Sequence, residues 1–166
     1  MLLLLLFWSF GFVVLYAAVG HETAPVISQL IKFGVATVVM VFLAQISPVF
    51  YLRLAPFLFL LGLILLVLVI FFGYEVNGSA RWLRIGGVFT FQPSEIMKLV
   101  IPMTLAWYFH ERHLPPRAKH LFWAAVIIGI PVVLIGIQPD LGTALLIGAS
   151  GLLVILLAGI SWRWIF

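Results

Sequence analysis

Long apolar stretches separated by shorter polar segments are the main pattern along this chain. A helix that crosses a bilayer needs about 20 consecutive, mostly apolar residues. The pattern predicts an all-α fold, a polytopic transmembrane helix bundle in a single membrane domain over residues 1–166. Six spans are expected, at approximately 2–19, 29–46, 57–72, 93–109, 121–137 and 144–160.

The first stretch ends in small residues, as a secretory signal does at its cleavage site. However, no Lys or Arg precedes it, and it is longer than the 7–15 residues of a signal core. We therefore interpret it as a true span.

The composition supports a membrane protein. Hydrophobic residues make up 65% of the chain and charged residues only 8%, whereas soluble domains have about 45–50% apolar residues. The net charge of +4 comes without a basic patch interleaved with aromatic residues, so nucleic-acid binding is not expected. The absence of cysteine excludes disulfides and thiolate chemistry. No cofactor or metal site is evident, and a divalent cation is left open without an identified site.

The distribution of Lys and Arg predicts the orientation. The predicted loops 47–56, 110–120 and 161–166 hold five of these residues, and the alternate loops hold two, Arg81 and Arg84. Because cytoplasmic loops carry the excess of positive charge, the N-terminus is expected in the cytoplasm.

The segment 73–90 mixes glycine, arginine and aromatic residues without a helical or alternating period. It is either a loose interfacial loop with Trp82 at the headgroups of the membrane lipids, or a structured hairpin on the membrane. In the hairpin, Arg81 and Arg84 would face anionic headgroups. The sequence leaves both interpretations open.

Charged residues at the expected outer ends of two spans are the candidate site. Glu95 and Lys98 lie in the first turns of span 93–109, where a buried charge is costly and therefore suggests function. Pro102 has no N–H to give to the carbonyl of Lys98. Asp140 precedes the sixth span, where capping alone could explain it. We expect Glu95, Lys98 and Asp140 to line an outward-facing cavity, with Arg81 or Arg84 at its rim.

Such a cavity would suit a lipid-linked anionic substrate, because cations bind its phosphates and apolar helix faces surround its tail. A separate stripe of small residues, Ala144, Gly148 and Gly151, predicts close helix packing on the sixth span.

Three motifs in order, G-S-A-R-W-L, F-Q-P-S-E-I-M-K-L and Q-P-D-L-G-T-A-L, resemble the shape, elongation, division and sporulation (SEDS) family of membrane glycosyltransferases. The resemblance covers nearly the whole chain. F-Q-P-S-E-I, together with I-P-M-T-L-A-W-Y-F and the Pro-Pro of the basic loop, is more similar to the rod-shape branch of the family than to the division branch.

The resemblance implies a fold of about ten spans. It also implies an enzyme that polymerises lipid II on the outer face of the bacterial cytoplasmic membrane and that works with a class B penicillin-binding transpeptidase as partner. It matches Glu95, Lys98 and Asp140 to the family's polar cavity, and Arg81 and Trp82 to its Arg-Trp pair. It also implies that this chain is an N-terminal half, not active alone. The family's proposed catalytic aspartate would lie beyond Phe166, so the catalytic residue is unknown here.

Two other functions use the same features. A flippase for lipid-linked sugars would move substrate without making polymer, but the inverted repeats of many transporters are not found in these six predicted spans. A membrane scaffold for a transpeptidase would dock partner spans on the small-residue faces, and its charges would be structural. Polymerisation by purified full-length protein would separate the enzyme from both.

Overall fold

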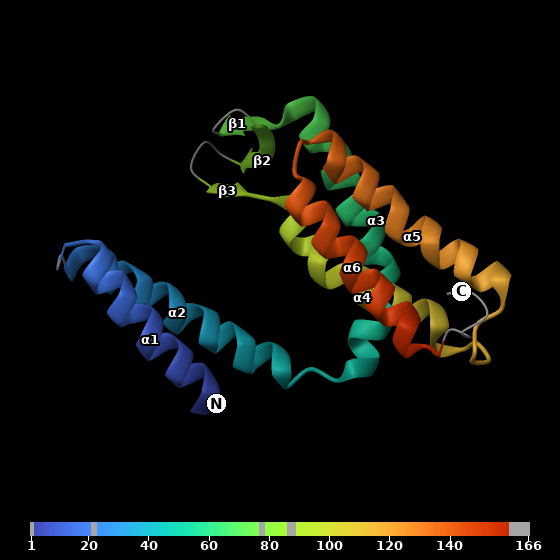
Figure 1. The fold of residues 1–166 in the computed structure, drawn as a ribbon, viewed down its shortest axis with the longest axis horizontal. Helices are drawn as coiled ribbons and strands as arrows, with labels where there is room; N and C mark the ends of the chain where they lie inside the picture. Colours follow the sequence, from blue (N-terminus) through green and yellow to red (C-terminus); the bar gives the residue numbers. More distant parts are fainter. Residues whose placement is uncertain (1, 21–22, 77–78, 86–88, 160–166) are drawn as a thin grey trace. The chain divides into compact units, whose positions relative to one another are not determined.

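The computed structural model describes residues 2–20, 23–76, 79–85 and 89–159 of the 166-residue chain. The described part holds six helices and a small three-stranded sheet (Figure 1). In chain order these are α1 (Leu2–Ala18), α2 (Thr23–Ala44), α3 (Pro48–Phe72), β1 (Tyr74–Val76), β2 (Ser79–Ile85), β3 (Phe89–Phe91), α4 (Pro93–His110), α5 (Ala118–Ile137) and α6 (Leu141–Leu157). The chain divides into two compact units, residues 1–47 and 48–166.

The first unit is a hairpin of two apolar helices, α1 and α2. Their contact is aromatic: Trp8 stacks on Phe33 with ring centroids 5.2 Å apart, and Phe12 meets the same ring edge-on at 5.4 Å. Such pairs add about 0.5–1.5 kcal/mol beyond the area that they bury. None of the described residues of α2 is buried. Within this unit, α2 therefore exposes its apolar surface.

The second unit is built around α4, which packs against α3, α5 and α6 (Figure 1). Buried apolar side chains of α4 meet buried side chains of the other three helices. The members of this core include Leu66 of α3, Met97, Ile101 and Leu105 of α4, Ile135 of α5 and Ile147 of α6. The opposite faces of these helices expose many leucines and phenylalanines. The helices thus pack apolar side chains against one another in the core and also expose apolar side chains on their outer faces, as a bilayer requires.

Two glycines allow the helices of this unit to approach closely. A side chain on Gly62 of α3 would overlap the sulfur of Met97. A methyl group on Gly151 of α6 would lie 2.6 Å from Cγ1 of Ile128 in α5. At Gly148 the nearest atom would be Val132 Cγ2 at 3.8 Å, an ordinary contact distance. Part of the small-residue stripe of α6 is therefore used against α5 of the same chain.

Several helix boundaries differ from those predicted. Residues 48–56 of the segment 47–56, which was expected as a turn, belong to α3, because Pro48 suits the first turn and the helix continues through Pro56. α2 begins at residue 23 rather than 29, and α5 begins at 118 rather than 121. α6 begins at 141 rather than 144, since Asp140 caps it, and it ends at 157 rather than 160.

Residues 160–166 lie outside the described part of the chain. They include the predicted loop 161–166, which ends at Phe166, so the structure does not test that loop. The catalytic aspartate expected beyond Phe166 likewise stays a prediction that rests on the resemblance.

The segment after α3 is a structured hairpin and not a loose loop. β1, β2 and β3 form an antiparallel sheet in the order β1-β2-β3. The expectation that this segment lies on the membrane stays a prediction.

Three of the described helices, α2, α3 and α5, are long and apolar enough to cross a membrane. α1 and α6 are also apolar but shorter. The helical bundle predicted from the sequence is confirmed, and the chain is a multi-pass membrane protein.

Candidate functional site

The sheet positions Arg81 beside the end of α3. The backbone N–H of Gly73 donates to the carbonyl of Val69, which turns the chain from α3 into β1. A side chain at Gly73 would meet that carbonyl and Ala80 of β2, so glycine lets the sheet lie close to the helix. β2 contacts both α3 and α4. Arg81, on β2, is consequently held near the start of α4.

Asp140 is the centre of the polar contacts in the candidate site. Its carboxylate lies 3.4 Å from Nη1 of Arg81, and it accepts hydrogen bonds from Nε2 of Gln92 at 2.9 Å and from the backbone N–H of Thr143 at 3.2 Å. The residue is 8% exposed. A carboxylate this buried is stable only when several donors surround it, and Asp140 has three.

Burial alone would raise the pKa of the Asp140 carboxyl. Hydrogen bonding by Thr143, the positive charge of Arg81 and the hydrogen bond from Gln92 act in the other direction, and they hold the pKa below its ordinary value. Asp140 is therefore ionised at neutral pH. It serves as a fixed negative charge at the start of α6.

The N-terminal ends of α4 and α6 meet at this carboxylate. Gln92 is the N-cap residue of α4 and Asp140 is the N-cap residue of α6, and the two side chains are hydrogen-bonded to each other. Each helix N-terminus presents unpaired N–H groups and a partial positive charge. Two such ends and the guanidinium of Arg81 thus lie beside the carboxylate of Asp140.

Lys98 and Glu95 form a separate ion pair on α4. Nζ of Lys98 lies 2.7 Å from Oε2 of Glu95, three residues earlier on the same helix. The Lys98 side chain is 28% exposed and that of Glu95 is 57% exposed. The three-residue cluster expected from the sequence is thus paired differently: Arg81 from the sheet, and not Lys98, is the ion-pair partner of Asp140.

The other residues of the predicted site have other neighbours. The guanidinium of Arg84 lies 3.8 Å from the ring centroid of Tyr74. Of the two arginines on β2, Arg81 is the one that contacts Asp140. Trp82 pairs with Tyr74 in the sheet register and is half-buried. Ser94, in the first turn of α4, is 1% exposed, and its Oγ has no hydrogen-bond partner among the described residues. The hydroxyl of Ser94 is thus a buried polar group without a hydrogen-bond partner in the described part of the chain, two residues after Gln92.

Two glutamines of this site were not predicted from the sequence. Gln92 holds Asp140, and Gln138 donates from Nε2 to the carbonyl of Leu66 in α3 at 3.0 Å while only 5% exposed. Each is followed by a proline and lies within a few residues of the start of a helix. The repeated Gln-Pro pair was a usable signal, because a polar side chain at such a position can bond to backbone or side-chain groups of a neighbouring element. No three His, Asp or Glu residues among those described gather as a metal site would need.

The chain was compared with known proteins. The family model described as cell cycle protein, of FtsW, RodA and SpoVE, matches residues 1–166. The peptidoglycan glycosyltransferase MrdB of Escherichia coli K12 is 38% identical over 165 residues, which are 99% of this chain and 44% of MrdB. A probable peptidoglycan glycosyltransferase FtsW of Hydrogenovibrio crunogenus is 32% identical and is matched over 87% of this chain and 38% of its own length.

Two solved structures are similar over 95% of this chain, each at 30% identity. The rod shape determining protein RodA of Thermus thermophilus gives a TM-score of 0.82 and is covered over 52% of its length. A chain in a peptidoglycan synthase complex that coordinates polymerization and crosslinking gives 0.83 and is covered over 46%. The chain spans less than half the length of the curated relatives described above. Since the family model matches it from end to end, the chain belongs to the cell cycle protein family of FtsW, RodA and SpoVE.

Proposed function

We propose that this chain is the N-terminal part of a membrane glycosyltransferase that polymerises lipid II during cell-wall elongation. The relatives from Escherichia coli and Hydrogenovibrio crunogenus are named peptidoglycan glycosyltransferases, one of them as probable. The rod-shape branch is favoured over the division branch, because MrdB matches more of the chain at higher identity than that FtsW does, and a RodA structure matches its fold.

The observation that carries the proposal is the hydrogen bond between Gln92 and Asp140, which joins the N-termini of α4 and α6 beside Arg81. Helix N-termini favour anions, and an arginine fork donates several hydrogen bonds to phosphate oxygens. A pyrophosphate-linked substrate would find fixed positive charge here and apolar helix faces for its tail. The part of the substrate that this site binds would therefore be the anionic phosphate and not the sugar.

Each side chain has a distinct role in this proposal. Arg81 would bind phosphate, and Asp140 would hold the guanidinium in place. Lys98 lies two turns or less into α4 and would supply a second cation, which Glu95 orients. Trp82, on the central strand β2, would contact the lipid-linked group. None of these groups is proposed as the general base, which would come from the part of the protein that the relatives have beyond this match.

The location and partner of the protein are also proposed. The Lys and Arg distribution supports an N-terminus in the cytoplasm and a site on the outer face of the bacterial cytoplasmic membrane. The similarity to a chain of a peptidoglycan synthase complex supports a class B penicillin-binding transpeptidase as partner. Because the chain has no cysteine, single cysteines report topology cleanly. A membrane-impermeant maleimide should label Glu75→Cys in intact cells and His113→Cys only after permeabilisation; the reverse pattern contradicts the orientation.

The function is tested in a chimera in which this chain replaces the matching segment of the Escherichia coli relative. Purified chimera should extend lipid II into glycan polymer, and Lys98→Met should reduce the rate about 10-fold or more, the loss expected for one charge-assisted contact. Lys119→Met is the matched control, because Lys119 lies in the first turn of α5 and away from the site. Movement of lipid II across vesicles without polymer would favour a flippase, and an unchanged rate in Lys98→Met would remove the proposed role of this lysine.

A further inference from the structure

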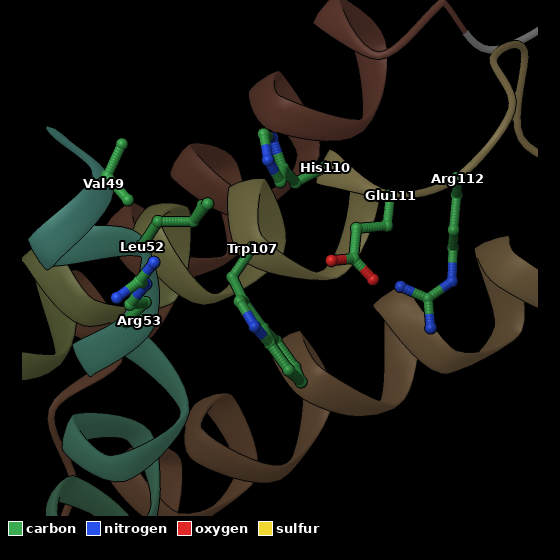
Figure 2. Close-up of a pocket in the computed structure, with 7 residues that line it drawn as sticks. All are labelled: Val49, Leu52, Arg53, Trp107, His110, Glu111 and Arg112. Atoms are coloured by element: carbon green, nitrogen blue, oxygen red, sulfur yellow. The ribbon is translucent and has the colours of Figure 1, made fainter.

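A polar cavity lies between the first turns of α3 and the last turn of α4 (Figure 2). Its volume is about 320 Å³. The residues that line it are Val49, Leu52, Arg53, Trp107, His110, Glu111 and Arg112. His110 lies twelve positions after Lys98 along α4, which is about 18 Å at 1.5 Å per residue. The cavity is therefore distinct from the site at the start of α4.

The cavity presents one positive and one negative charge that are not paired. Among the described residues, neither Arg53 nor Glu111 has an ion-pair partner, although both line the same cavity. Arg112 is already engaged: it donates to the carbonyl of Tyr108 and lies 3.7 Å from the centroid of that ring. Figure 2 shows Arg53 and Glu111 on either side of Trp107. A ligand that satisfies both charges needs an anionic and a cationic group.

The remaining lining fits the surface of a membrane. Trp107 is 41% exposed, and tryptophan concentrates at the level of lipid headgroups. The face of an indole ring also attracts an ammonium group. Val49 and Leu52 provide apolar wall on the side of α3. Since α3 is long and apolar enough to cross a membrane, its first turns lie near the interface.

We propose that this cavity binds the phosphoethanolamine headgroup of a zwitterionic membrane phospholipid. Arg53 binds the phosphate, and Glu111 accepts hydrogen bonds from the primary ammonium, which rests against Trp107. An anionic headgroup without an amine would leave Glu111 facing a like charge. A choline headgroup carries no N–H for Glu111 to accept. The arrangement of one free cation and one free anion thus selects the ethanolamine lipid.

The proposal is tested by native mass spectrometry of the purified chain in detergent, with equal amounts of phosphatidylethanolamine, phosphatidylglycerol and phosphatidylcholine of the same acyl chains. The wild type should retain phosphatidylethanolamine about fivefold more than either other lipid, the preference expected from an exposed charge pair. Arg53→Gln and Glu111→Gln should each abolish that preference. Arg117→Gln and Glu75→Gln remove the same charges from positions that do not line the cavity, and they should retain it.

The fold of each variant is checked by circular dichroism, and Trp107→Leu provides a variant that changes no charge and should weaken the preference. Preferred retention of phosphatidylglycerol would overturn the proposal, as would wild-type behaviour in both Arg53→Gln and Glu111→Gln. Equal loss in the control variants would show a general effect of surface charge and would overturn it as well. Soluble O-phosphoethanolamine is added in a separate arm; if it displaces the lipid at equal concentration, the ligand is a soluble ester and the lipid assignment is wrong.

Discussion

Replacing Asp140 with alanine removes three interactions from the start of α6 at once. The carboxylate caps the helix through the N–H of Thr143, accepts a hydrogen bond from Gln92 and pairs with Arg81. Asparagine at the same position keeps the shape and the cap but removes the charge, because asparagine is as good an N-cap as aspartate. Asparagine has one acceptor oxygen, so it keeps the cap but places an NH2 donor where Gln92 donates, and it loses both the Gln92 hydrogen bond and the ion pair. The two substitutions therefore separate the cap from the other two interactions.

The expected cost follows from these contacts. Loss of the cap costs about 1 kcal/mol, and loss of the acceptor for Gln92 about another 1 kcal/mol. The Arg81 side chain is 33% exposed, so its ion pair is screened by solvent and is counted at no more than about 0.5 kcal/mol. Asp140→Ala should thus lower the free energy of unfolding by about 2–3 kcal/mol. Asp140→Asn keeps the cap but loses the acceptor for Gln92 and the ion pair, so it should lower the free energy of unfolding by about 1–2 kcal/mol.

The assay is unfolding of the purified chain in mixed detergent micelles, followed by far-ultraviolet circular dichroism. Glu75→Ala, at an exposed position of β1, is the control and should change little. A double-mutant cycle of Asp140→Asn with Arg81→Gln measures the ion pair directly. The reasoning would be refuted by equal destabilisation in the alanine and asparagine variants, since the cap would then contribute nothing.

Three further results are expected from the same chain. Because the pKa of Asp140 is lowered in the folded state, the ionised carboxylate stabilises the fold above about pH 4, and this stabilisation is lost as the pH falls below that value. The difference in unfolding free energy between wild type and Asp140→Asn should therefore shrink on acidification. A difference that does not change with pH would contradict this. Gly151→Ala should lower the free energy of unfolding by about 1–3 kcal/mol, and Ile128→Ala should restore it, because the added methyl group would overlap the Ile128 side chain. Gly148→Ala should change the free energy of unfolding by no more than about 0.5 kcal/mol. Gln138→Leu should cost about 1 kcal/mol in the same assay, because its buried amide donates to a carbonyl of α3; wild-type stability would argue against that bond.

The sequence by itself determined the class of the protein and the positions of most helices. A helix in a bilayer must satisfy all its backbone groups internally and expose apolar side chains, so long apolar runs leave few alternatives. The starts of α4 and α6 were marked by Gln-Pro pairs and acidic residues, which the structure places at or beside the helix caps. The expected turn at 47–56 was wrong, because a proline in the first turn begins a helix as readily as it ends one.

Only the tertiary structure decided which cation meets Asp140. Arg81 and Arg84 are three residues apart on a strand, so they point to opposite faces of the sheet. The sequence cannot say which face meets the helices, and the structure places Arg84 over Tyr74 and Arg81 against Asp140. Lys98 was the other candidate, but it pairs with Glu95, three residues earlier on its own helix. Pairing between charges depends on distances between elements, and these are fixed by the packing of the helices and the sheet and not by local sequence.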